Sequence, residues 1–254
     1  MPGNRNVQVY FQKASMYNLL ADYYKYSNPQ LHVLYYQKHL KNLYKAIHLV
    51  SPDFRNTEGM QQQPAEFRLF HASPDADKVD IYLNGSRIFK DFPYKKVSSY
   101  MTLAPGIYQI DIYPAGDMVT TIISTKVNVE PEKCYTSAVA GPVTKPRLSV
   151  FEDEPGVPVG ESKARFIHLS YDAPACDVAV KNGDVIFPDA PYSKATNYLG
   201  LTPMTVDLEV RVAGTKNVAL DLSQLKFRPN QGYTIVLVGT AQGEPELEAI
   251  ILQG

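Results

Sequence analysis

The sequence of 254 residues contains no tryptophan and only two cysteines. The absence of tryptophan removes the largest aromatic side chain that could stack on a sugar ring. Cys134 and Cys176 are too few for a disulfide framework, and we expect two separate, partly buried thiols. The sequence also lacks a glycine-rich phosphate loop, a dinucleotide fingerprint and paired His or Cys spacing. Three common cofactor classes therefore have no anchor, and we expect neither a cofactor nor a bound metal.

Long apolar runs are also absent. No segment approaches the ~20 apolar residues that span a bilayer, so we expect no transmembrane segment. Residues 1–6 lack the apolar stretch of a secretory signal. We therefore expect the chain to be synthesised in the cytoplasm. Its deposition on a cell envelope or a spore surface would require a non-classical route.

The sequence has no dense cluster of lysine and arginine. Residues 1–64 hold seven basic and three acidic residues, a net charge of +4, whereas residues 65–254 hold 18 and 23, a net charge of −5. Such modest charges are usually solvated. We therefore expect no nucleic-acid partner.

The most informative positive feature of the sequence is a duplication. Residues 67–76 and 165–173 share a His-x-Ser-x-Asp-Ala pattern, and His168 follows His71 by 97 residues. Further matches at a spacing of 98 residues extend across the whole period, which indicates duplication of an entire domain rather than a short solenoid repeat. These matches pair Asn84-Gly85 with Asn182-Gly183, Tyr94 with Tyr192, Tyr100 with Tyr198, and Ala115-Gly116 with Ala213-Gly214.

Each copy is rich in short β-type segments. In the first copy, turn signals such as Asn84-Gly85 and Pro105-Gly106 separate runs of β-branched and aromatic residues. About seven strands without a helical interval favour an antiparallel sandwich over a parallel α/β sheet. The expected strands are residues 67–72, 79–83, 97–103, 107–113, 119–129, 135–140 and 147–151.

The sequence therefore predicts a mainly β protein with two tandem immunoglobulin-like antiparallel β-sandwich domains. Their limits are residues 65–154 and 163–254, with an N-terminal α-helical hairpin before them. The linker at residues 154–160 contains two prolines and two glycines. We expect it to keep the two repeats as separate domains with limited mutual contact.

Residues 1–60 form a Tyr-rich extension that holds eight of the 18 tyrosines. Ser15 is expected to cap a first helix, and Asn28-Pro29 supplies a break followed by a new N-cap with proline at the first helical position. Ser51-Pro52 ends the second helix, and the stretch up to Pro64 has the composition of a linker.

The second helix carries an apolar heptad seam, which needs a partner surface. The partner is the first helix, a β-domain or another copy of the chain, and we therefore expect either packing within the chain or self-association through the N-terminal helices. The predicted interface residues of the seam are Val33, Tyr36, Leu40, Leu43 and Ile47.

A motif in the first copy carries a family resemblance. It runs from Arg68-x-x-His71-x-Ser73-x-Asp75 through Val-Asp-Ile-Tyr-Leu-Asn-Gly at 79–85 to a Pro-Gly-x-Tyr turn at 105–108. This pattern resembles the bacterial domain catalogued as Domain of Unknown Function family 4397, over residues 67–154 and again 165–253. The resemblance implies tandem β-sandwiches of a kind often found in bacterial envelope or surface proteins, without an established catalytic role. In the second copy, Tyr171 replaces the usual proline after the serine.

His71, Ser73 and Asp75 are the residue types of a hydrolytic triad, and His168 and Asp172 repeat the pattern. Alternate residues of a strand lie ~6.8 Å apart on one face, which is too far for proton transfer. We therefore favour a structural role, in which the serine and aspartate accept backbone N–H groups in a local turn that closes the first strand.

Tyr94 and Tyr192 lie in matching Asp-x-Pro-Tyr sequences, where the ring either stacks on a ligand or packs over the sandwich. The candidate ligand-binding residues are accordingly His71, Asp75, Tyr94, His168, Asp172 and Tyr192. A calcium site made by Asp75, Asp77 and Asp80 is an alternative for the first repeat only, since the second repeat has Pro174 in place of the middle aspartate.

These features favour a non-enzymatic structural or adhesion-type protein of a bacterial envelope or spore surface, which acts through protein–protein contacts and self-assembly. The alternative is a ligand-binding module for a glycan or small molecule, with its site in the Asp-x-Pro-Tyr loops or in a cleft between the repeats. A hydrolase that uses His71 and Ser73 is the third hypothesis.

Overall fold

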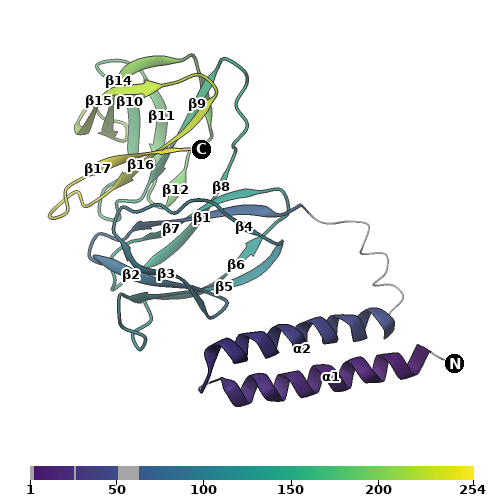
Figure 1. Cartoon of the computed structure of the whole chain (residues 1–254). Coiled ribbons are helices and arrows are strands. Elements are labelled where there is room, and N and C mark those ends of the chain that lie inside the picture. The colour runs from purple at the N-terminus through teal and green to yellow at the C-terminus, as the bar shows by residue number, and fades with distance from the viewer. Residues whose placement is uncertain (1–2, 26, 51–62) are drawn as a thin grey trace. The chain divides into compact units, whose positions relative to one another are not determined.

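A computed structural model describes residues 3–25, 27–50 and 63–254 of the chain (Figure 1). The chain divides into two compact units, Met1–Gln61 and Gln62–Gly254. The first unit contains the helices α1 (Gly3–Tyr24) and α2 (Pro29–Val50), and the second contains 17 strands. The prediction of a mainly β protein with an N-terminal helical hairpin is therefore confirmed. The linker predicted after the hairpin lies outside the described residues up to residue 62.

Small and histidine side chains form the contact between α1 and α2. Ala14, Ala21 and Ala46 are buried, so the helices approach closely at these points. The Nδ1–H of His32 donates to the Ala21 carbonyl oxygen at 2.8 Å, and that of His39 donates to the Ala14 carbonyl oxygen at 2.9 Å. These two bonds attach the rings of α2 to the backbone of α1.

Tyrosine rings stack across the same hairpin. The ring centroid of Tyr35 lies 6.2 Å from that of Tyr17 and 5.6 Å from that of Tyr24, with nearly parallel planes. The Lys38 ammonium lies 5.4 Å from the Tyr35 centroid and 5.6 Å from the Tyr17 centroid, within the range of a cation–π interaction. Part of the tyrosine enrichment therefore serves to hold the two helices together.

The helix boundaries confirm one cap prediction and correct another. Asn28 caps α2 as expected, since its side-chain oxygen accepts the Leu31 N–H at 3.2 Å. Ser15 is not a cap but lies inside α1. The residues before Ser15 contain no proline or glycine after Gly3, so nothing interrupts the helix and the local cap signal is overridden. Neither described helix is long and apolar enough to cross a membrane.

The first repeat contains β1 (Ala65–Ala72), β2 (Lys78–Leu83), β3 (Ser86–Pro93), β4 (Met101–Leu103), β5 (Gly106–Pro114), β6 (Ile123–Val129), β7 (Cys134–Ala140) and β8 (Arg147–Asp153). They form two four-stranded sheets, with the orders β4-β1-β7-β8 and β3-β2-β5-β6.

The second repeat contains β9 (Ser162–His168), β10 (Cys176–Val180), β11 (Val185–Ala190), β12 (Lys194–Ala195), β13 (Leu199–Leu201), β14 (Met204–Val212), β15 (Val218–Phe227), β16 (Gln231–Val238) and β17 (Glu248–Gln253). Its sheets have the orders β12-β9-β16-β17, with β13 also paired to β9, and β11-β10-β14-β15. The topology of the first repeat is thus reproduced, with β12 as one additional short strand.

Two details of the strands differ from the sequence prediction. The sheets are not wholly antiparallel, because β1 pairs in parallel with β7, and β9 in parallel with β16. Strand β3 was missed in the sequence analysis because it is an edge strand with exposed charges and a terminal proline. The Asn84-Gly85 turn that joins β2 to β3 is confirmed, since both residues have positive φ, 49° and 77°. The immunoglobulin-like label and the exact repeat limits stay predictions.

Each repeat has an apolar core between its own two sheets, as in a β-sandwich. In the first repeat, Phe67 of β1 packs with Ile81 of β2 in this core. In the second repeat, Phe166 of β9 packs with Val178 of β10. All four side chains are fully buried or nearly so. The matching positions confirm that the duplicated sequence produces a duplicated core.

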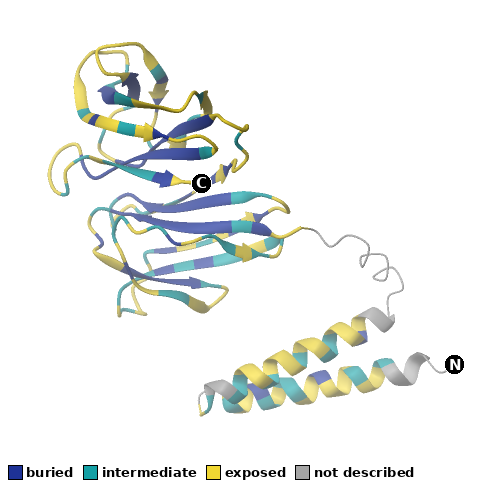
Figure 2. Ribbon diagram, turned by 45° about the horizontal axis from the view of Figure 1, so that its top comes forward, coloured by how far each residue is buried: buried dark blue, intermediate teal, exposed yellow. Residues whose placement is uncertain are grey.

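A third apolar cluster joins the two repeats. Phe70, Ala138 and Phe151 of the first repeat pack against Ile167 and Val236 of the second. The sheet that contains β1 therefore faces the sheet that contains β9. Strands β1 and β9 are buried on both faces (dark blue in Figure 2). The prediction of limited contact is wrong. The residues of β1 and β9 that point away from each core include the apolar Phe70, Ala72 and Ile167, and these side chains are buried where the two sheets meet.

A buried carboxylate completes the interface between the repeats. Asp153, at the end of β8, lies 3.9 Å from Arg68 and forms an ion pair with Arg165 of the second repeat. Its oxygens also accept hydrogen bonds from Thr136 at 2.6 Å and Tyr100 at 2.7 Å. The carboxylate and both guanidinium groups are almost fully buried. Asp153 therefore compensates two buried cations that belong to different repeats.

The two arginines make reciprocal contacts across the interface. Arg68 of the first repeat donates to the Gln253 carbonyl oxygen of the second at 3.0 Å. Arg165 of the second repeat donates to the Glu152 carbonyl oxygen of the first at 2.6 Å. Each arginine thus reaches the last strand of the other repeat.

We predict that Asp153→Ala lowers the free energy of unfolding by about 3–5 kcal/mol, because two buried guanidinium groups lose their counter-charge. Glu152→Ala is the matched control. Its ion pair with Lys133 is exposed to solvent, so its removal should cost at most about 1 kcal/mol. Urea unfolding of both variants measures the difference, and equal losses would contradict the assigned role of Asp153.

Candidate functional site

The structure uses the predicted triad residues to hold loops rather than to form a catalytic relay. The Nδ1 atom of His71 accepts the backbone N–H of Ser73 at 3.4 Å, not its hydroxyl group. The Ser73 hydroxyl instead donates to the Gly141 carbonyl oxygen at 2.6 Å. The histidine is therefore not placed to remove the serine proton, and the serine is not presented as a nucleophile.

The aspartates of the motif bind a distant loop. Both carboxylate oxygens of Asp75 accept the Val143 N–H, at 2.9 and 3.0 Å, from the loop between β7 and β8. Asp172 accepts the N–H groups of Ala241 and Gln242 from the corresponding loop of the second repeat, at 2.8 and 3.1 Å. The structural role was predicted correctly, but the predicted local turn was wrong, because the acceptor bonds span about 70 residues of sequence.

Two of the three aspartates in the calcium alternative, Asp75 and Asp80, bind different partners. Asp80 accepts the Asp91 N–H at 2.8 Å and an Arg87 N–H at 3.3 Å. Among the described residues, no group of three His, Cys, Asp or Glu side chains is arranged to hold a metal. The Asp80 carboxylate therefore stabilises the hairpin of β2 and β3, while Asp75 holds the β7–β8 loop.

Burial changes the acid–base chemistry of both histidines. His71 is fully buried, and desolvation of its charged form lowers its pKa from 6.5 to about 4, although a backbone contact to Ala76 opposes the shift. The pKa of His168 is also lowered, again mainly by burial. Both rings are neutral near pH 7. In the described structure, Nε2 of His168 donates to the Pro174 carbonyl oxygen at 3.0 Å.

We predict that acid destabilises the protein through His71. Between pH 6.5 and about 4, the unfolded chain binds a proton at this position and the folded chain does not, so stability falls as the pH falls through this window. The loss amounts to at most about 3 kcal/mol. His71→Asn keeps an acceptor but removes the titration, so the stability gap between wild type and variant should shrink from pH 7 to pH 4 in urea unfolding. A gap that does not change with pH would exclude this effect.

The tyrosines of the Asp-x-Pro-Tyr elements pack against the opposite repeat. The Tyr94 hydroxyl lies beside Gly239 and Glu248 of the second repeat. Burial and that carboxylate raise the pKa of Tyr94 to about 12, while the backbone contact to Gly239 opposes the rise. A Cβ atom at Gly141 of the first repeat would lie 3.1 Å from the Tyr192 hydroxyl oxygen. Both rings therefore pack between the repeats. The sequence had predicted either stacking on a ligand or packing over the sandwich of the same repeat.

We predict that Gly239→Ala and Gly141→Ala each destabilise the protein by about 2–4 kcal/mol. Both glycines have positive φ, and an added Cβ would lie 2.1 Å from the Glu246 carbonyl oxygen or 2.8 Å from that of Lys145. Gly116→Ala is the control, because this glycine has φ +77° but no atom within 4 Å of the added Cβ. It should lose only about 1 kcal/mol in thermal or urea unfolding. A control loss as large as the test losses would show that backbone strain alone is responsible.

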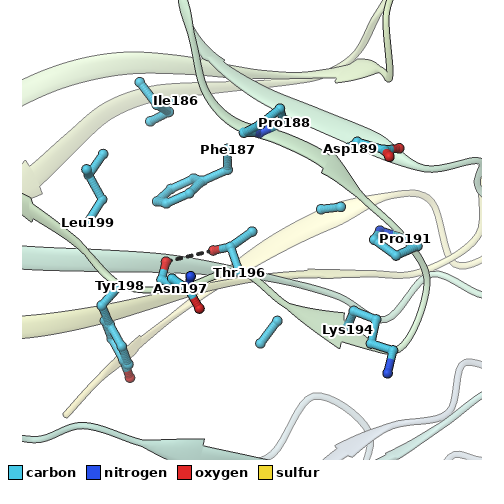
Figure 3. A pocket seen from close by; sticks show the side chains of 12 residues that line it. Ile186, Phe187, Pro188, Asp189, Pro191, Lys194, Thr196, Asn197, Tyr198 and Leu199 are labelled. Atoms are coloured by element: carbon cyan, nitrogen blue, oxygen red, sulfur yellow. Dashed lines mark hydrogen bonds between the residues drawn. The ribbon is translucent and has the colours of Figure 1, made fainter.

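One cavity lies wholly within the second repeat (Figure 3). It has a volume of about 440 Å³, and Phe187, Tyr198 and Leu199 contribute to its lining. The Tyr198 ring is already covered by Lys163 and Arg165, whose charged atoms lie 4.5 and 4.7 Å from its centroid. The Thr196 hydroxyl, beside Asn197 in Figure 3, is also occupied by hydrogen bonds to backbone groups. This cavity therefore presents few free groups to a ligand.

A larger cavity lies between the repeats, at one end of their interface. Its volume is about 610 Å³, within the usual range of small-molecule sites. The first repeat contributes the loop between β7 and β8, and the second contributes two tyrosines. The lining residues are Pro142, Thr144, Lys145, Pro146, Arg147, Tyr171 and Tyr192. This cavity, which we call the inter-repeat cleft, is the best-formed candidate site among the described residues.

Sequence reasoning identified only one residue of the inter-repeat cleft, Tyr192. Lys145 and Arg147 were missed because they carry no motif, and Tyr171 was noted only as a departure from the repeat pattern. The other candidate ligand-binding residues do not line this cleft. A comparison of the positions at which the two repeats differ could have identified the residues of the inter-repeat cleft.

The predicted interface residues of α2 lie mostly on the exposed side of the hairpin. Val33, Tyr36, Leu40 and Ile47 are exposed, and Leu43 is partly buried. The seam is therefore only partly covered within the hairpin.

Comparison with known proteins identifies a family. The model of the family described as "Domain of unknown function (DUF4397)" matches residues 65–179 and again 165–253. No curated protein sequence matches the chain.

Two solved structures resemble the chain weakly. One is a candidate cell adhesion protein from Bacteroides ovatus, with 10% identity and a TM-score of 0.23, covering 76% of this chain and 97% of its own. The other is the fimbrial anchor protein Mfa2 from Porphyromonas gingivalis, with 10% identity and a TM-score of 0.22, covering 75% of this chain and 97% of its own. TM-scores this far below 0.5 carry no information on function.

Proposed function

The chain belongs to the family described as Domain of unknown function (DUF4397), and from that premise we propose that it is a non-enzymatic structural, adhesion-type protein that self-associates through its helical hairpin. The polar residues that suggested catalysis support this proposal, because each is occupied in holding the β unit together. The Ser73 hydroxyl and the Asp75 carboxylate, for example, both bind backbone groups of the β7–β8 loop.

The observation that carries the proposal is the large exposed apolar surface of the hairpin. On α1, Met16, Leu19 and Tyr23 are exposed, with Tyr23 at 75% of its full accessible surface. On α2, Val33 and Leu40 of the heptad seam are exposed as well. On each helix these side chains recur at the spacing of one helix face, and a group of exposed apolar side chains indicates an interaction site, whereas single ones are common on any protein.

A second copy of the chain is the partner that fits this surface best. The α2 side chains follow the 3–4 heptad spacing of helices that pack on other helices. Two helices of 22 residues have too little buried apolar surface to be very stable alone. Two hairpins that join their apolar faces form a four-helix bundle, in which each covers the exposed residues of the other.

The proposal extends to the location of the protein. The family resemblance to domains of bacterial envelope and surface proteins supports a role on an envelope or a spore surface. Fractionation of the producing cells tests this part, and recovery of the protein only from the cytosol of vegetative cells would refute it.

We predict that the full-length protein forms oligomers in multiples of 28.4 kDa, and that Val33→Glu/Leu40→Glu converts them to monomers. The substitutions place two charges in the apolar surface, where burial is unfavourable. Size-exclusion chromatography with light scattering measures the mass, and circular dichroism checks that the helices remain.

The matched control is Gln37→Glu/Lys41→Gln. It changes the net charge by the same two units at exposed polar positions of the same helix. It should leave the oligomers intact. A monomeric wild-type protein, or dissociation of the control to the same extent, would reject assembly through the heptad seam.

A further inference from the structure

The duplication provides an internal comparison, because side chains needed for the shared fold should appear in both repeats. The inter-repeat cleft contains several side chains that do not. Tyr171 occupies the position of Pro74 in the first repeat. Arg147 pairs with the last residue of β7, and in the second repeat Glu248 pairs with the last residue of β16. The repeats therefore differ at positions that meet in one cavity.

The opposite end of the interface has different chemistry. There, Tyr94 lies beside Glu248, which forms an ion pair with Lys95. In the inter-repeat cleft, the equivalent tyrosine, Tyr192, lies close to Arg147, whose positive charge opposes the rise in the Tyr192 pKa that burial causes. At one end of the interface, the charges of Glu248 and Lys95 are paired with each other. At the other end, the cation Arg147 lies close to Tyr192.

The cations of the inter-repeat cleft have no internal partner. Throughout the described residues, neither Lys145 nor Arg147 forms an ion pair or a side-chain hydrogen bond. No aspartate or glutamate lines the cleft. A guanidinium group and an ammonium group that line one cavity, with no carboxylate among its lining residues, favour an anionic ligand. Carboxylates suit arginine particularly well, because the two groups form paired hydrogen bonds.

The aromatic side chains of the cleft favour a ligand that contains a ring. Tyr171 is 40% exposed, and Tyr192 is partly buried in the cleft wall. A tyrosine offers a flat apolar face for the C–H groups of a ring and a hydroxyl for hydrogen bonding. Pro142 and Pro146 add rigid apolar walls. The combination of flat apolar surface, hydroxyl groups and two cations matches a sugar ring that carries a carboxylate.

We propose that the inter-repeat cleft binds an acidic glycan through carboxylate contacts to Arg147 and Lys145 and ring packing on Tyr171. The site lies in the β unit and does not depend on assembly through the helices. A cleft of about 610 Å³ accommodates one or two sugar units of a longer chain. The protein would thus recognise an acidic polysaccharide through its β unit.

The test is isothermal titration of the full-length protein with a tetrasaccharide of galacturonic acid, and with a neutral tetrasaccharide of galactose as the uncharged probe. We expect binding of the acidic probe only, weakened by added salt. Arg147→Glu, which introduces the residue type of the second repeat, should weaken binding at least tenfold. Tyr171→Pro, which introduces the residue type of the first repeat, should weaken it about fivefold or more.

Lys126→Glu is the matched control, because it makes the same charge reversal at an exposed position on β6, outside the cleft. It should change the affinity less than twofold. Thermal unfolding of each variant checks that the fold is retained. No binding of the acidic probe, equal binding of the neutral probe, or an unchanged affinity in Arg147→Glu would overturn the proposal. A hexaglutamate peptide that binds as tightly as the sugar would also overturn it, since charge alone would then be recognised.

Discussion

The burial of β1, β7, β9 and β16 on both faces is the constraint on which the rest of the β unit depends. An ordinary sandwich has one buried and one solvated face in each sheet, whereas here the central strands of the two inner sheets are buried on both faces. Polar side chains in these strands must then find partners inside the protein. Arg68 and Arg165 do so through Asp153, and the motif histidines do so as neutral rings. Packing requirements thus account for the recurrence of the His-x-Ser-x-Asp motif in both repeats.

The hairpin has the opposite character. Its two helices contact each other through alanines, histidine–carbonyl hydrogen bonds and stacked tyrosines, so its larger apolar side chains remain available on the outside. The chain therefore combines a β unit with three apolar clusters buried inside it and a helical unit whose larger apolar side chains are mostly exposed. This contrast is why the proposed assembly uses the helices, while ligand recognition is assigned to the β unit.

Much of the architecture was predictable from the sequence, because it depends on local patterns. Most strands, the Asn84-Gly85 turn and the cap at Asn28 have short-range signals, and the duplication shows directly as matching residues 97–98 positions apart. The contact between the repeats was not predictable. The apolar residues Phe70 and Ala72 alternate with the core residues of β1, but a sequence does not state which surface covers them. The same limit explains the local turn wrongly assigned to Asp75, whose partner lies 68 residues away. It also explains why the cleft expected between the repeats was not assigned Lys145, Arg147 and Tyr171, which come from distant parts of the chain.

The reciprocal contacts between the repeats have a further consequence. Arg68 reaches the last strand of the second repeat as Arg165 reaches that of the first, so the two copies meet through the same patch, as the subunits of an isologous dimer do. In such an isologous contact, two repeats occupy each other's patch completely. A third repeat would find both patches occupied, so lengthening the gene by further duplication could not extend this stack into a filament.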